Sequence, residues 1–224
     1  QLATIAFGAI RDGDWHEAVD YYTAKHSNTI EYPDIPTWLR DAGAIYSVNN
    51  GGVGGNYLLL PETQSLYQRM NGNFENMPDL LTKANEMGTD VILMVDWYDS
   101  ATITGVDKID KDKIDSITSP YYNKGDYVPR TDMGGEEAFK AGVKALHEAG
   151  GKIMVYVEPF VVLQYSEIGR EMGEFWAARN PLGELDTTYA DACSYSMSCA
   201  VKEWREYLVD VCVRLVEEYG VDGI

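Results

Sequence analysis

Residues 136–158 read EEAFKAGVKALHEAGGKIMVYVE, a helical pattern that runs within a few residues into an apolar strand. Apolar side chains recur at helical spacing, at Phe139, Val143 and Leu146, and a glycine pair ends the helix. The following run, KIMVYVE, is apolar almost throughout, as strands are when helices cover both faces of a parallel sheet. This stretch therefore predicts one helix–strand unit of a parallel α/β fold.

The same unit recurs on both sides of this stretch. A helix expected from Phe74 precedes an apolar run at 90–96, and a stripe from Val201 to Tyr219 precedes the run 221–224. An earlier apolar run covers residues 44–48. Apolar strands that alternate with amphipathic helices indicate a parallel sheet covered by helices. We expect the four runs to be neighbouring parallel strands in sequence order.

The connections between these elements differ in length. Turns from helix to strand take a few residues, whereas the connections from strand to helix span residues 97–133 and 159–199. Long connections without clear secondary structure in a compact domain are usually functional. They leave the carboxyl ends of the strands, where parallel α/β proteins build their sites.

Four strands are half the number in a (β/α)8 TIM barrel, which typically has about 250 residues. The fourth run is cut after Ile224, which would leave an open sheet edge. We therefore expect residues 41–224 to be the N-terminal half of a TIM barrel, truncated within strand 4. Residues 1–40 start without Met and contain a helix expected at 14–26, so we expect the end of a β domain plus a linker helix.

The composition limits the partners of the chain. Its 224 residues include 36 acidic and 18 basic side chains, a formal net charge of −18. A surface this acidic repels phosphate backbones and anionic lipids, and we therefore expect neither a nucleic-acid nor a membrane partner. A neutral ligand is the one that we expect. No apolar run approaches the roughly 20 residues of a membrane helix. The three cysteines are too few for a disulfide scaffold and leave the redox compartment open.

The second strand ends in a carboxylate beside two aromatic residues, Asp96, Trp97 and Tyr98. A carboxylate accepts hydrogen bonds from sugar hydroxyls, and aromatic faces cover the apolar C–H patches of a sugar ring. We expect these three residues to bind substrate. The alternative is that the two rings pack under the long connection while Asp96 caps a turn.

The third strand ends in Glu158, which its alternation places at the same mouth as Asp96. Paired carboxylates there could serve as acid and base or as hydroxyl acceptors. The alternative is an ion pair between Glu158 and a loop arginine such as Arg130, which we expect to orient substrate. Asp132 is expected to cap the following helix, and Asp191 to touch ligand or to hold its loop.

Other patterns do not support a cofactor. The glycine-rich run 51–55 is not followed by a helix and lacks the third glycine of a dinucleotide fingerprint. The aspartates at 107–115 lack calcium-loop spacing, and the three histidines are scattered. We expect neither a cofactor nor a metal ion.

Three segments carry a resemblance to a known group of enzymes. They are GGEEAFK at 134–140, GGKIMVYVEP at 150–159, and WREYL with EYGVDGI within 204–224. Together they resemble barrel glycoside hydrolases, closest to an uncharacterised bacterial family of glycoside-hydrolase-like proteins and more distantly to the α-galactosidase and α-amylase groups. The segments DWHEA at 14–18 and PTWLR at 36–40 resemble the helix that links a β-sandwich domain to the barrel in that family.

The resemblance implies a glycoside hydrolase that is retaining and uses two carboxylates in its intact form. In such relatives the fourth strand ends in the nucleophilic aspartate and the acid/base lies further on, so the missing C-terminal half would supply both. Asp96 and Glu158 match positions that commonly bind sugar, which implies binding rather than catalytic roles for them. The expected partners are an oligosaccharide or glycoside and the rest of the barrel.

Two other functions remain open at this stage. One is a non-catalytic carbohydrate-binding or assembly module. The other is a barrel lyase or aldolase, which should show a Schiff-base lysine or metal ligands at a strand end, and the sequence shows none. An extracellular or periplasmic location is favoured over the cytoplasm, while the sugar, its linkage and the oligomeric state are not specified by the sequence.

Overall fold

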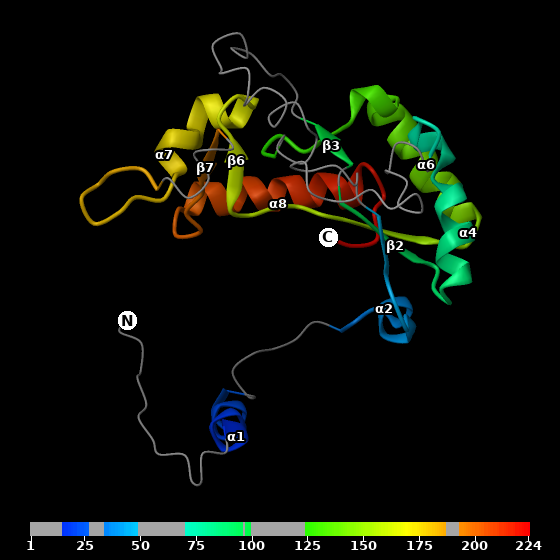
Figure 1. Ribbon diagram of the computed structural model, residues 1–224, viewed down its shortest axis with the longest axis horizontal. Helices are drawn as coiled ribbons and strands as arrows, with labels where there is room; N and C mark the ends of the chain where they lie inside the picture. The colour runs from blue at the N-terminus through cyan, green and yellow to red at the C-terminus, as the bar shows by residue number, and fades with distance from the viewer. Residues whose placement is uncertain (1–14, 27–33, 49–69, 96, 100–123, 187–192) are drawn as a thin grey trace, which may run out of the picture. The chain divides into compact units, whose positions relative to one another are not determined.

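The computed structural model describes residues 15–26, 34–48, 70–95, 97–99, 124–186 and 193–224 (Figure 1). The chain divides after Asp41 into two compact units. The described part of the first unit contains α1 (Trp15–His26), where a helix was expected, and the short α2 (Thr37–Asp41). No helix in the described ranges is long and apolar enough to span a bilayer.

The second unit is built on a parallel sheet. Its strands are β1 (Tyr46–Val48), β2 (Val91–Met94) and β5 (Lys152–Val155), which lie side by side in that order. Ile92 of β2 pairs with Tyr46 on one side and with Ile153 on the other. Apolar side chains on both faces of β2 are buried, which is what a strand covered on both sides requires.

The chain ends on a fourth position in this sheet. Gly223 forms a parallel bridge with Met154, and the amide of Val155 donates to the carbonyl of Gly223 at 3.0 Å. The amide of Asp222 in turn donates to the carbonyl of Ile153 at 2.8 Å. The prediction of four neighbouring parallel strands in sequence order is therefore confirmed.

The three expected helices are present. The first begins as the 3-10 turn η2 (Phe74–Asn76) and continues as α4 (Pro78–Glu86); the others are α6 (Gly135–Glu148) and α8 (Lys202–Glu217). Glycines with left-handed backbone follow all three, Gly88 at φ +77°, Gly150 at +92° and Gly220 at +77°. Because glycine adopts this conformation without a steric penalty, it ends each helix and turns the chain into the next strand.

The helix that begins at Phe74 is capped at the start of η2. Asn76 does not cap it; its side-chain amide donates to the carbonyl of Met70 at 2.8 Å. Asn73 caps η2 instead, because its side chain accepts the amide of Glu75 at 2.9 Å. The 3-10 turn moves the capping position to the residue before Phe74.

The two long strand-to-helix connections contain more secondary structure than the sequence suggests. After β2 the chain forms β3 (Tyr98–Asp99), which pairs antiparallel with β4 (Val128–Pro129) just before α6. After β5 it forms β6 (Val161–Leu163), which pairs antiparallel with β7 (Ser194–Ser196) just before α8. The expectation of connections without clear secondary structure is thus wrong, since each leaves and returns as a two-stranded ribbon.

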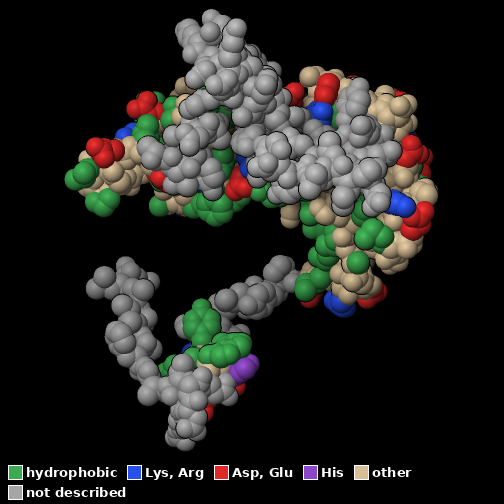
Figure 2. Space-filling model, viewed as in Figure 1, with side chains coloured by type: hydrophobic (Ala, Val, Ile, Leu, Met, Phe, Trp, Pro, Cys, Tyr) green, Lys and Arg blue, Asp and Glu red, His purple; other side chains and the backbone are tan. Residues whose placement is uncertain are grey.

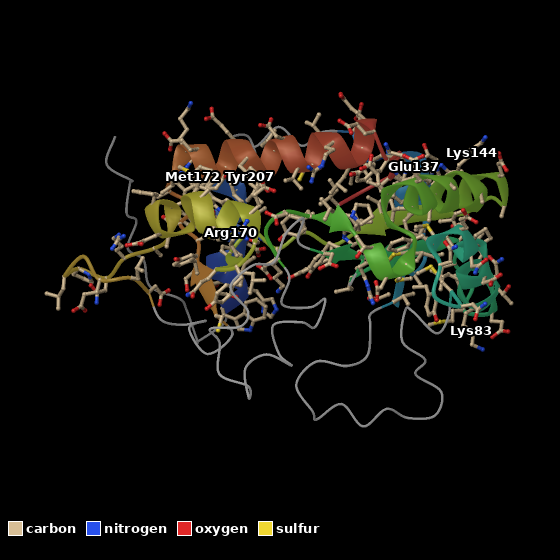
Figure 3. The ribbon with its side chains drawn as sticks, turned by 90° about the horizontal axis from the view of Figure 1, so that it is seen from above. Lys83, Glu137, Lys144, Arg170, Met172 and Tyr207 are labelled. Atoms are coloured by element: carbon tan, nitrogen blue, oxygen red, sulfur yellow. The ribbon has the colours of Figure 1, made fainter. Side chains whose placement is uncertain are left out.

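The remaining short elements are η5 (Thr131–Met133), the π-helix η6 (Gly169–Gly173) and α7 (Glu174–Trp176). Within the second unit, α8 extends between α7, β6 and β7 on one side and α4 with α6 on the other (Figures 1 and 3). Tyr207 of α8 packs against Trp176 of α7, with ring centroids 6.1 Å apart. Acidic side chains are visible at several places on the surface of this unit (Figure 2).

The core lies between the sheet and the helices. Phe74, Phe139 and Trp97 are completely buried in it, and the rings of Phe74 and Phe139 meet edge to face at 5.0 Å. Gly142 of α6 lets the helix approach η2 closely, since a Cβ there would lie 2.0 Å from the carbonyl oxygen of Phe74. This contact packs α6 directly against η2.

Candidate functional site

Glu158 lies just beyond the carboxyl end of β5, and Tyr127 holds its backbone. The Tyr127 hydroxyl donates to the carbonyl of Glu158 at 2.8 Å and accepts from its amide at 2.8 Å. Tyr127 is completely buried and has φ +50°, a left-handed conformation that costs a non-glycine residue on the order of 1–3 kcal/mol. Burial raises the pKa of Tyr127 well above its ordinary value, so the hydroxyl keeps the proton that it donates.

The next two residues are fixed by other parts of the second unit. The indole Nε1 of Trp204 in α8 donates to the carbonyl of Pro159 at 2.9 Å. The amide of Met197 donates to the carbonyl of Phe160 at 2.7 Å. Three successive carbonyls, from Glu158 to Phe160, therefore have partners from three separate segments, and this short segment is rigidly positioned.

The carboxylate of Glu158 is surrounded by donors. The Lys124 ammonium lies 3.5 Å from Oε2, the Tyr156 hydroxyl donates to the same oxygen, and the Phe160 amide donates to Oε1 at 3.2 Å. The side chain of Lys124 is only 6% exposed, while that of Glu158 is 15% exposed. A carboxylate offers about four acceptor positions, so this one can take a further hydrogen bond from a ligand.

The segment Lys124–Tyr127 supplies the ammonium that faces the Glu158 carboxylate and the hydroxyl that holds the Glu158 backbone. All four carbonyls of this segment accept hydrogen bonds. The amide of Leu163 donates to the first at 2.9 Å, and the Tyr207 hydroxyl donates to the second at 2.9 Å. The Arg214 guanidinium donates to the third and fourth at 2.9 and 3.0 Å. Two of the three donors belong to α8, so this helix holds the groups that face Glu158.

Asp126 joins the two long connections. Its carboxylate accepts the amides of Glu167 at 2.9 Å and Ile168 at 3.0 Å, at the turn that leads into η6. Asp126 is buried, and these hydrogen bonds compensate the loss of its hydration. The connection after β2 is thereby tied to the connection after β5 at the carboxyl end of the sheet.

Trp97 and Tyr98 are completely buried in the second unit. The indole of Trp97 donates to the carbonyl of Tyr156 at 3.0 Å, and its ring lies 5.7 Å from Tyr98 and 5.3 Å from Phe139. These contacts correspond to the packing alternative, because neither ring has exposed surface to place against a sugar. Direct sugar binding by these two residues stays a prediction.

Arg130 directly follows β4, is buried, and forms an ion pair with Asp132. Its Nε and Nη2 donate to the two carboxylate oxygens of Asp132 at 2.9 and 2.6 Å. The suggested ion pair between Arg130 and Glu158 is therefore wrong; Lys124 takes that place. Asp132 is also not the cap of α6, because Gly134, at φ +93°, precedes the helix and no side chain caps it. Substrate orientation by Arg130 stays a prediction.

Two predicted site residues, Asp96 and Asp191, lie outside the described residues, so the expected approach of Asp96 to Glu158 stays a prediction. Cys193, Cys199 and Cys212 are free thiols. Across the described ranges, no group of three or more His, Cys, Asp or Glu side chains could hold a metal ion.

Asp222 lies at the opposite end of β5 from Glu158. Its carboxylate accepts from Lys152 at 2.7 Å and from the amide of Ile153 at 3.0 Å, and it contacts His147 of α6 at 2.7 Å. Burial by itself would raise the pKa of Asp222, but the hydrogen bonds from Lys152, Ile153 and His147 lower it overall. Asp222 thus anchors the C-terminal segment to β5 and α6.

Several residues at this site were not identified from the sequence. Tyr156 and Phe160 share the alternation of Glu158, at two residues before and two after, and this pattern could have identified them. Lys124 and Tyr127 lie inside a long connection, and no local pattern marks them. Only the folded chain brings them to the end of β5.

Comparisons with known proteins agree with this architecture. Residues 116–224 match a protein family described as a domain of unknown function (DUF6259). A search of curated proteins found no match.

Among solved structures, the chain is similar to a noncanonic maltogenic α-amylase from Thermotoga neapolitana, with a TM-score of 0.53, 17% identity, and coverage of 80% of this chain and 37% of that one. An α-amylase from Lactobacillus plantarum has a TM-score of 0.53 and 21% identity, and the match covers 81% of this chain and 37% of that one. An α-galactosidase from Geobacillus stearothermophilus has a TM-score of 0.52 and 12% identity, and the match covers 84% of this chain and 21% of that one.

These similarities establish the fold. The chain spans little more than a third of the two amylases and about a fifth of the galactosidase. The second unit is a mixed α/β domain with a parallel sheet, and the 80–84% of the chain that these comparisons cover corresponds to part of a glycoside-hydrolase-like fold.

Proposed function

We propose that this chain is the N-terminal half of a TIM-barrel glycoside hydrolase, and that the end of β5 around Glu158 binds the sugar. The observation that carries the proposal is a carboxylate fixed at the carboxyl end of a parallel strand, where proteins of this architecture build their sites. The fold shared with α-amylases and an α-galactosidase supports it.

The proposed role of Glu158 is to accept a hydrogen bond from a sugar hydroxyl. Lys124 and Tyr156 fix the carboxylate, and Tyr127 fixes the backbone that carries it, so little order has to be gained on binding. Loss of this acceptor from a bound sugar would cost roughly 1–3 kcal/mol. Asp96, Arg130 and Asp191 complete the proposed set of binding residues.

The proposed reaction is hydrolysis of an O-glycosidic bond with retention, through two carboxylates and an oxocarbenium-like transition state. We propose that the nucleophile and the acid/base belong to the part of the barrel that this chain does not contain. In that case the intact sequence carries an Asp or Glu within about four residues after Ile224, where the fourth strand reaches the mouth. We also propose that residues 1–40 connect to a preceding β domain and that the protein is extracellular or periplasmic.

Activity of the intact protein tests this proposal. Aryl α-glucosides and aryl α-galactosides are suitable substrates, because the similar solved structures are α-amylases and an α-galactosidase. We expect turnover by the intact protein and none by residues 1–224 alone. Turnover by the 224-residue chain, or an apolar continuation after Ile224 without an acidic residue, would contradict the proposal. Sugar binding without turnover by the intact protein would instead support a non-catalytic carbohydrate-binding module.

A further inference from the structure

We infer that Phe160 is the aromatic platform of the site and stacks against a neutral sugar ring that Glu158 holds by a hydroxyl. This inference rests on the proposed function and adds the residue and the kind of sugar face that it recognises. Aromatic faces cover apolar C–H patches, and the phenyl ring of Phe160 has no polar group to offer a substrate.

The first observation is the combination of a fixed backbone and an exposed ring. The amide of Phe160 donates to Glu158 Oε1 at 3.2 Å, and its carbonyl accepts from Met197 at 2.7 Å. The residue is nevertheless 54% exposed. An exposed aromatic side chain on a fixed backbone has few torsions left to order when a ligand stacks on it, which suits a binding platform.

The second observation is that the other rings near Glu158 are already in use. Trp97, Tyr98 and Tyr127 are completely buried, and Tyr156 is partly buried with its hydroxyl bonded to the Glu158 carboxylate. Among the described residues that hydrogen-bond to this carboxylate, Phe160 is the exposed aromatic residue, whereas the Tyr156 hydroxyl is occupied by the carboxylate itself.

The third observation concerns charge. The groups around the carboxylate already balance it, since the Lys124 ammonium lies 3.5 Å from Glu158. The chain as a whole has a formal net charge of −18. This negative charge repels an acidic sugar, so the platform fits a neutral pyranose such as glucose or galactose.

Binding measurements on the intact protein test the inference. Maltotriose and melibiose are the neutral probes, digalacturonate is the acidic one, and each is titrated by calorimetry. We expect Phe160→Ala to weaken binding of a neutral probe about tenfold, equivalent to about 1.4 kcal/mol, and Phe160→Trp to retain it. Phe175→Ala is the matched control, because Phe175 is also exposed, at 78%, and lies on α7. It should leave affinity unchanged.

The outcomes separate this inference from the proposed function. If Glu158→Gln loses binding while Phe160→Ala binds as tightly as the wild type, the platform is refuted and the proposed function stands. Tighter binding of digalacturonate than of both neutral probes would refute the neutral-sugar part. If the wild-type protein binds neither neutral probe and hydrolyses no aryl glycoside, the proposed function fails and the inference fails with it.

Discussion

The hydroxyl of Tyr127 makes two hydrogen bonds to the backbone of Glu158, each 2.8 Å long, and Tyr127→Phe removes both. The ring contacts would remain, because Tyr127 packs on Trp97 and Tyr98 through its ring, at 6.5 and 5.1 Å between centroids. A typical intramolecular hydrogen bond contributes about 0.5–1.5 kcal/mol to stability. Two such bonds therefore predict a loss of about 1–3 kcal/mol in the free energy of unfolding.

Urea unfolding followed by tryptophan fluorescence measures this loss. Tyr165→Phe is the matched control in the same unit, because the Tyr165 hydroxyl forms no hydrogen bond within the described residues and Tyr165 is only partly buried. Its unfolding free energy should stay within about 0.5 kcal/mol of the wild type, as for most substitutions away from specific contacts. Equal values for Tyr127→Phe and Tyr165→Phe would refute the role assigned to the Tyr127 hydroxyl.

The same variant should change the response to alkaline pH. Burial raises the pKa of Tyr127, so the native state keeps a proton that the unfolded chain releases near pH 10. Where the native state binds more protons, stability falls as the pH rises. The wild type should therefore lose stability above about pH 10, and Tyr127→Phe should show a shallower loss in unfolding curves recorded across that range.

Two further predictions concern the frame of the site. The pKa of Asp222 is lowered in the native state, so the stabilising effect of its carboxylate is present above about pH 4 and is lost as the pH falls through the native pKa. Asp222→Asn should therefore lower the melting temperature of the protein at neutral pH. It should also flatten the fall of the melting temperature at acid pH. Gly142→Ala should destabilise the protein by about 1–3 kcal/mol, because the new Cβ would lie 2.0 Å from the carbonyl oxygen of Phe74. Gly43→Ala is the control and should have no such effect, because no atom lies within 4 Å of the Cβ that it would add. Equal losses of unfolding free energy in urea would contradict the close packing of α6 on η2.

The sequence predicts the sheet well because its signals are local. The runs around β2 and β5 are apolar on both faces, and a glycine follows each of the three preceding helices, so element type and order can be inferred without tertiary information. The strand ends follow directly from this order. Glu158 was predicted at the carboxyl end of β5 for that reason.

The surroundings of Glu158 could not be predicted in the same way. The segment Lys124–Tyr127 is held by hydrogen bonds from Leu163, Tyr207 and Arg214. These donors lie 39 to 88 residues along the chain from the carbonyls that accept them, and no periodicity encodes such contacts. The side on which an aromatic ring packs is equally non-local. Trp97 was expected to face substrate, but contact with Phe139 of α6 buries its ring.

A crystal structure of the intact protein with a bound neutral oligosaccharide tests the central claim most directly. The account predicts a sugar at the carboxyl end of the parallel sheet, with one hydroxyl within about 3 Å of a carboxylate oxygen of Glu158. A sugar bound elsewhere, with the Glu158 carboxylate still contacting only Lys124, Tyr156 and the Phe160 amide, would contradict it.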